Sequence, residues 1–159
     1  MVCMMDLNEF LALWESARDD PVRVIELFLR AILVCEKDRE LGEQMISYLL
    51  HPDRCDKDPN SPSGYRPNRI GVGFYIDQLL RRPEIVRSYL GGTPENDYRI
   101  DESNIKVEVV SVEKKNDVAR VVIRSSGKDF PTPIILKYVD GAWRIYEGIS
   151  SLATGVRKS

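Results

Sequence analysis

The sequence predicts an α+β domain in which an N-terminal helical layer packs on a C-terminal antiparallel sheet. Apolar residues recur at helical spacing in the first half of the chain and alternate with polar residues over residues 104–148. At 159 residues the chain suits one domain. We divide it into residues 1–51 (helical), 52–69 (a polar loop), 70–92 (short helices) and 104–148 (the sheet). We expect three to five helices in the N-terminal layer and three to four strands in the C-terminal sheet.

Three longer helices are predicted in the first segment. Asp6, with Glu9 three residues later, forms a capping-box signature for the first helix. Asp20 suits the N-cap of the second and Pro21 its first helical position. The apolar surface of this second helix is so wide that we expect the helix to be covered on more than one side. The third, "DRELGEQMISYLL", ends before His51-Pro52.

The middle of the chain contains loops and short helices. Residues 52–69 hold four prolines and little apolar character, which predicts a long surface loop or a partly disordered one. No strand is evident before residue 100. Helical spacing returns in "GVGFYIDQLLRR" and "PEIVRSYL". The stretch "SYLGGTPENDYRI", residues 88–100, contains Gly91, the expected C-cap glycine, followed by a capped turn at Thr93-Pro94-Glu95. We interpret this stretch as a structural corner and not as a ligand loop.

The sheet is predicted from two hairpins. Ile105, Val107 and Val109 alternate with charged residues, and "KKND" turns the chain into a second strand. The next hairpin, "TPIILKYVDGAWRIYEG", turns at Asp140-Gly141, a favoured two-residue turn pair. Basic residues alternate along these strands, which is typical of the solvated face of an amphipathic sheet; a basic binding face is the alternative. They include Lys114, Lys115, Arg120, Arg124, Lys128, Lys137, Arg144, Arg157 and Lys158.

Composition excludes several kinds of chemistry. A single histidine, His51, argues against multi-histidine metal sites, and His51 with Cys55 is at most half of a zinc site unless Cys3 and Cys35 converge on it. No phosphate-binding loop is evident, so we expect neither metal nor cofactor. A net charge of -2 does not favour nucleic acid, and no apolar stretch suits a membrane span. Without a secretory signal, we expect a cytoplasmic protein with reduced thiols.

Candidate site residues are few. A curved sheet around helices can enclose a pocket, where Asp77 and Tyr75 are candidates for proton transfer and Tyr65, Tyr89 and Tyr98 for ligand binding. The alternative is that the tyrosines fill the core with their hydroxyl groups at its rim, and that Asp77 faces solvent.

Two resemblances add to these predictions. The closing "DGAWRI" pattern resembles the last strands of the NTF2-like (cystatin-like α+β) superfamily, which implies a cone-shaped sheet. Four stretches resemble a family of uncharacterised bacterial domains of unknown function: "ELGEQMISYLL", "RSYLGGTPENDY", "SSGKDFPTPIILK" and "WRIYEGISSLATGVRK". This second resemblance spans most of the chain and implies a bacterial, intracellular protein. It supplies no catalytic residues.

We favour a non-catalytic binding or protein-interaction module, whose partner is an unknown protein or small molecule. The alternative is an NTF2-like pocket enzyme, an isomerase or hydrolase, that uses a carboxylate and a tyrosine. A third possibility is a homodimer through the sheet, in which Val110, Val112 and Val122 are buried against a second copy.

Overall fold

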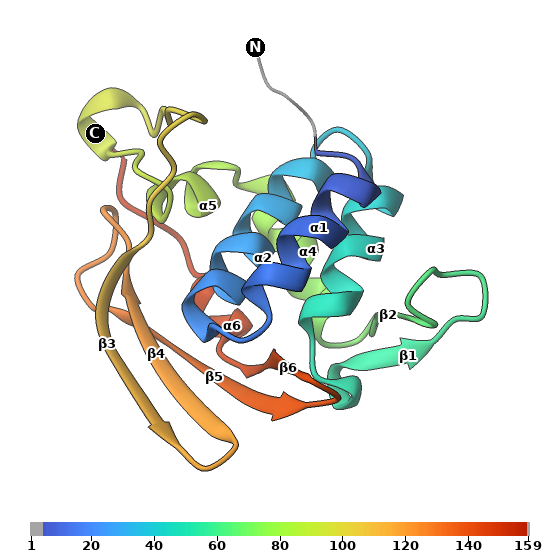
Figure 1. Ribbon diagram of the computed structural model, residues 1–159. Coiled ribbons are helices and arrows are strands. Elements are labelled where there is room, and N and C mark those ends of the chain that lie inside the picture. The colour runs from blue at the N-terminus through green and yellow to red at the C-terminus, as the bar shows by residue number, and fades with distance from the viewer. Residues whose placement is uncertain (1–4, 159) are drawn as a thin grey trace.

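The computed structural model describes residues 5–158. Helices α1 (Leu7–Ala17), α2 (Pro21–Cys35) and α3 (Arg39–Leu49) form the N-terminal layer. The middle of the chain contributes η1 (Pro52–Arg54), β1 (Cys55–Lys57), β2 (Tyr65–Pro67), α4 (Val72–Arg81), α5 (Glu84–Ser88) and η2 (Pro94–Asn96). The C-terminal part holds β3 (Glu108–Lys115), β4 (Val118–Arg124), β5 (Thr132–Val139), β6 (Ala142–Glu147) and α6 (Ile149–Leu152). The predicted α+β class is confirmed (Figure 1).

The long helices begin at the predicted caps. The Asp6 carboxylate accepts a hydrogen bond from the backbone N–H of Glu9 at 2.8 Å, and the Glu9 side chain completes the capping box. Asp20 caps α2 in the same way through the N–H of Val22. Helix α2 packs against α1, α3, α4, α5, β4 and β6, so its wide apolar surface is covered on several sides, as predicted. Its buried residues include Val24, Ile25, Leu27, Phe28, Leu29, Ala31, Ile32 and Val34.

The four C-terminal strands form an antiparallel sheet in the order β3-β4-β5-β6, which curves around one side of the helices (Figure 1). The Asp140-Gly141 turn has φ values of 52° and 76°, the positive pair that a type I′ hairpin requires. Strand β3 begins at Glu108, later than the predicted residue 104. The reason is its partner: Glu108 pairs with Arg124, the last residue of β4, so Ile105 and Val107 have no strand to pair with.

The segment 52–69 is more ordered than a polar loop. β1 and β2 form a short antiparallel hairpin, so strands do occur before residue 100. Three-residue strands composed mostly of charged residues and proline carry no alternation signal. Contacts with β6 hold the segment in place: Leu50 bridges to Ile145, and the Arg54 side chain donates a hydrogen bond to the carbonyl oxygen of Tyr146 at 2.7 Å.

The predicted corner at residues 91–98 is held by local bonds, and the hydroxyl groups of Ser126 and Tyr98 join it to distant parts of the chain. Gly91 has φ of +107°, and the N–H of Gly92 bonds to the carbonyl of Arg87 at 2.9 Å, closing α5 as in a Schellman motif. Thr93 and Asn96 then form a reciprocal capping box around η2. A Cβ on Gly92 would lie 2.7 Å from the backbone of Tyr98, so the corner also requires a close backbone approach. The side-chain bonds of Asn96 stay within this corner.

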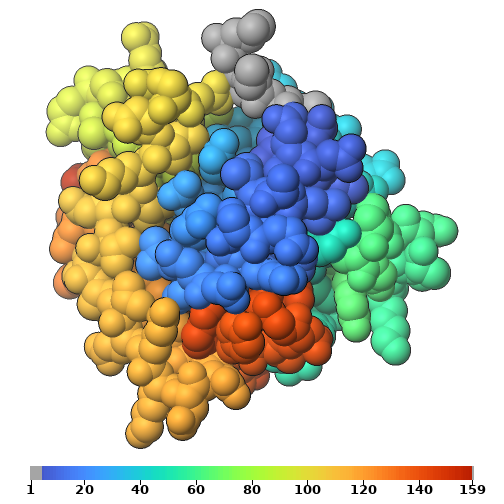
Figure 2. Space-filling model, viewed as in Figure 1, coloured from blue at the N-terminus to red at the C-terminus, as the bar shows by residue number. Residues whose placement is uncertain are grey.

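Strand β3 is an edge strand that extends beyond the helices, as the orange and blue surfaces in Figure 2 show. For this reason Val110 and Val112 remain 46% and 42% exposed. In residues 5–158, no helix combines the length and the apolar character that crossing a membrane requires.

Candidate functional site

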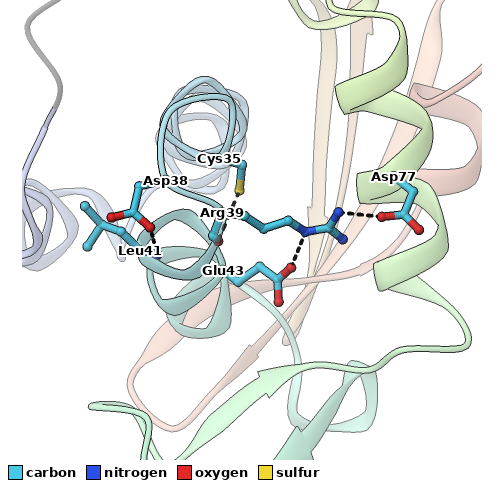
Figure 3. A network of polar contacts seen from close by, with 6 residues as sticks. All are labelled: Cys35, Asp38, Arg39, Leu41, Glu43 and Asp77. Carbon is cyan, nitrogen blue, oxygen red and sulfur yellow. Dashed lines mark hydrogen bonds and ion pairs between the residues drawn. The ribbon is translucent and has the colours of Figure 1, made fainter.

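The candidate carboxylate Asp77 lies in a surface ion-pair network (Figure 3). The Arg39 guanidinium bridges Glu43 and Asp77, each at 2.6 Å, and the Asp77 side chain is 41% exposed. A general base in a pocket needs partial desolvation and access to a substrate. Asp77 has instead a cationic partner and a large solvent-exposed fraction.

Tyr75 and Asp77 do not converge on one cleft. They are two residues apart on α4, and a helix turns about 100° per residue, so their side chains leave the helix on different sides. Tyr75 lines a surface cleft, and Asp77 is not part of the lining of that cleft. The pairing of Asp77 with Tyr75 is therefore absent from this cleft.

The three candidate ligand-binding tyrosines occupy different environments. Tyr89 is buried, and its hydroxyl forms a 2.6 Å hydrogen bond with the hydroxyl of Thr132; burial raises the pKa of Tyr89 to about 12. Tyr98 is also buried, and its hydroxyl donates to the carbonyl oxygen of Arg157. Tyr65 lines a small cavity of about 170 Å³. Tyr89 therefore acts in packing, whereas Tyr98 also lines a separate cleft of about 580 Å³.

The part of the chain that the structure describes contains no cluster of three metal-ligating side chains. His51 accepts a hydrogen bond at Nδ1 from the N–H of Asp53, 3.1 Å away, which serves to cap η1. Cys35 is buried, and burial raises the pKa of the Cys55 thiol to about 11. Cys3 lies outside the described residues. In this region His51 is thus a capping group.

A better candidate site is a cleft of about 520 Å³, which we call the Arg54 cleft. It lies between the outer face of the sheet, the start of α4 and the start of α6. Its lining comprises Arg54, Asn68, Gly71, Val72, Tyr75, Arg120, Pro133, Ile135, Tyr146, Glu147, Gly148, Ile149, Ser150 and Ser151.

Cationic groups surround the Tyr146 ring beside this cleft. The Arg54 guanidinium lies 4.4 Å from the ring centroid, and the Lys137 ammonium lies 3.7 Å from it. Both distances are in the cation–π range. The His51 ring meets Tyr146 edge-on, with centroids 5.0 Å apart. Two like charges on one ring create a local excess of positive potential that an anion would offset.

Each cation is positioned by the local fold. The hydrogen bond from Arg54 Nε to Tyr146 orients the guanidinium and leaves its two terminal NH₂ groups available. Arg120 lies on β4 opposite Ile135 of β5, so the two side chains share the outer face of the sheet. Asn68, which also lines the cleft, is held against the start of α4, because its Oδ1 accepts a hydrogen bond from the N–H of Val72, the first residue of that helix, at 2.8 Å.

The basic residues of the sheet divide by role. Arg144 lies on the same outer face, but it donates to the carbonyl oxygens of Tyr48, Val139 and Asp140 and is used in packing. Arg120 and Lys137, noted in the sequence for their alternation, are left facing outward beside the cleft. Arg54 and Tyr146 carried no sequence signal, because only the contact between η1 and β6 brings them together.

The proposed dimer surface does not form one face. Val112 pairs with Val121, which lies on the inner face, whereas Val122 is the next residue of β4 and points to the outer face. Val122 is also 7% exposed, in contrast to Val110 and Val112. A homodimer through the sheet stays a prediction that rests on Val110 and Val112.

Comparison with known proteins gives one match. Residues 5–159 match the family described as Domain of unknown function (DUF6935). The chain therefore belongs to this family, and the predicted membership of a family of unknown function is confirmed. No curated protein and no solved structure matches the chain. The NTF2-like resemblance stays a prediction.

Proposed function

We propose that this member of the DUF6935 family is a non-catalytic binding module that recognises an anionic group in the Arg54 cleft. One observation carries the proposal: Arg54 and Arg120 line one cleft, and among residues 5–158 neither has a carboxylate oxygen within 4.0 Å. Glu147 contributes the one carboxylate of the lining and is exposed.

The chemistry of the cleft suits binding. A guanidinium presents a planar set of donors that matches a carboxylate or phosphate in a bidentate arrangement. The aromatic ring of Tyr146 covers the Arg54 guanidinium on one side. The lining of the cleft contains no histidine and no cysteine, the side chains that most often act as base or nucleophile.

The test is a titration of the isotope-labelled protein with inorganic pyrophosphate, followed by the amide resonances. We expect saturable shifts at Arg120 and Tyr146. Arg120→Gln should weaken binding by about tenfold, which corresponds to about 1.4 kcal/mol. Arg124→Gln is the matched control, because Arg124 lies on the same strand but is paired with Glu108 at 3.2 Å and lies outside the cleft lining. Equal affinities of the two variants would contradict the proposal.

A further inference from the structure

The Arg54 cleft continues into a second cleft. This second cleft, which we call the Phe130 cleft, has a volume of about 560 Å³. It is lined by Gly127, Lys128, Asp129, Phe130, Pro131, Thr132, Pro133, Ser151, Thr154, Gly155, Val156 and Arg157. Pro133 and Ser151 line both clefts, so the two clefts adjoin at the first residues of β5 and the C-terminal segment; we call the two together the groove.

Two exposed phenylalanines lie in or near this groove. Phe130 is 82% exposed in its own cleft. Phe74 lines neither cleft, but it is 50% exposed and packs edge-on against Tyr75, a residue of the Arg54 cleft. Such aromatic residues, together with arginine, are enriched in protein–protein interfaces. A bound small molecule would leave most of an exposed phenylalanine side chain in contact with water, whereas a bound polypeptide chain would cover it.

The charges of the groove are unequally distributed between its ends. Arg54 and Arg120 lie at one end without an ion-pair partner in the described part of the chain, beside the single carboxylate of Glu147. At the other end the cations are engaged. Lys128 donates to the carbonyls of Ser151 and Leu152, and Arg157 pairs with Asp129 at 2.7 Å. At the Phe130 end the two cations are thus held by backbone carbonyls or by Asp129, whereas the two arginines of the Arg54 end have no carboxylate partner in the described part of the chain.

We infer that the groove binds an extended segment of another polypeptide, with an acidic side chain at Arg54 and Arg120 and an apolar side chain at Phe130. This inference rests on the proposed function and specifies its partner. Each cleft has the volume of a small-molecule site, and a ligand of that size fills one cleft without reaching the other. A peptide spans both, and its carboxylate complements the unpaired cations.

The test begins with selection of a random peptide library on the full chain. The enriched peptides should combine acidic and apolar residues. The most enriched peptide is then synthesised with a fluorescent label, and its affinity is measured by anisotropy. Phe130→Ser should weaken peptide binding by about tenfold and leave the pyrophosphate titration unchanged. Arg120→Gln should weaken both, and Arg124→Gln neither. Because Phe130 is 82% exposed, its substitution is not expected to disturb folding.

The outcomes separate this inference from the proposed function. Two outcomes would overturn the peptide inference alone. In the first, the protein binds pyrophosphate but the library yields no acidic peptides. In the second, it binds both, but Phe130→Ser leaves the affinity for the peptide unchanged. Absence of pyrophosphate binding by the wild-type protein would refute the proposed anion site. Self-association that light scattering detects in the wild type, and that Phe130→Ser abolishes, would assign the groove to a second copy and would also overturn the inference.

Discussion

Gly148, which joins β6 to α6, should tolerate no side chain. Its φ is +116°, and a Cβ at this position would lie 2.5 Å from the carbonyl oxygen of Pro133 and 2.9 Å from Cα of Ile134. Both contacts are with backbone atoms of β5, so relief of the clash requires a strand to move. Gly148→Ala therefore combines backbone strain with overpacking.

The magnitude follows from the two contributions. An L-residue at such a positive φ costs about 1–2 kcal/mol, and overpacking of this kind adds about 1–3 kcal/mol. Gly91→Ala is the matched control, because Gly91 has φ of +107° and no atom within 4 Å of its added Cβ. The control should therefore lose only the first contribution.

Urea unfolding followed by circular dichroism measures both variants. We expect Gly148→Ala to lose about 2–5 kcal/mol of unfolding free energy and Gly91→Ala about 1–2 kcal/mol. If Gly148→Ala is no less stable than Gly91→Ala, the close approach of the β6–α6 junction to β5 is refuted. Because Gly148 also lines the Arg54 cleft, the same variant should weaken pyrophosphate binding.

Two further predictions concern buried polar groups next to the groove. Tyr89→Phe should lower the unfolding free energy by about 1–3 kcal/mol, because it leaves the buried Thr132 hydroxyl without its 2.6 Å partner. Tyr65→Phe is the control, and the same urea unfolding should show a smaller loss of unfolding free energy. An equal loss in the two variants would argue against the Tyr89 hydrogen bond. Burial lowers the pKa of Lys128 from 10.5 to about 8. Between these pH values the Lys128 side chain binds more protons in the unfolded state than in the folded state. The contribution of Lys128 to the unfolding free energy therefore rises as pH increases from 8 to 10.5 and does not change with pH below 8. The unfolding free energy measured across this pH range should rise less in Lys128→Met than in the wild type. Identical slopes of unfolding free energy against pH would contradict the burial of Lys128.

Much of the fold could be predicted because its signals are local. The Asp6 and Asp20 caps, the Gly91 helix end and the Asp140-Gly141 turn each depend on residues within a few positions of one another. The β1–β2 hairpin could not be predicted in this way. Its three-residue strands are stabilised by α3 and β6, which are distant in sequence, and their charged residues and proline favour a loop when considered alone.

The candidate site was predicted only in part. Tyr75 and the alternating Arg120 are at the Arg54 cleft, whereas Asp77 belongs to the ion-pair network of Arg39. Both candidates on α4 looked equivalent in the sequence, since each lies in a helix near the expected pocket. The direction in which each side chain leaves α4, and the neighbour that it meets, distinguish them in the structure.

The sequence by itself determined the α+β class, the caps and the turns, because backbone conformation near a cap or turn depends on adjacent residues. Only the tertiary structure decided the site. Arg54 and Tyr146 are separated by 92 residues and meet through a hydrogen bond and a cation–π contact. The two clefts adjoin because Pro133 of β5 and Ser151 of α6 line both of them. Such contacts depend on how whole elements pack, which no local pattern encodes.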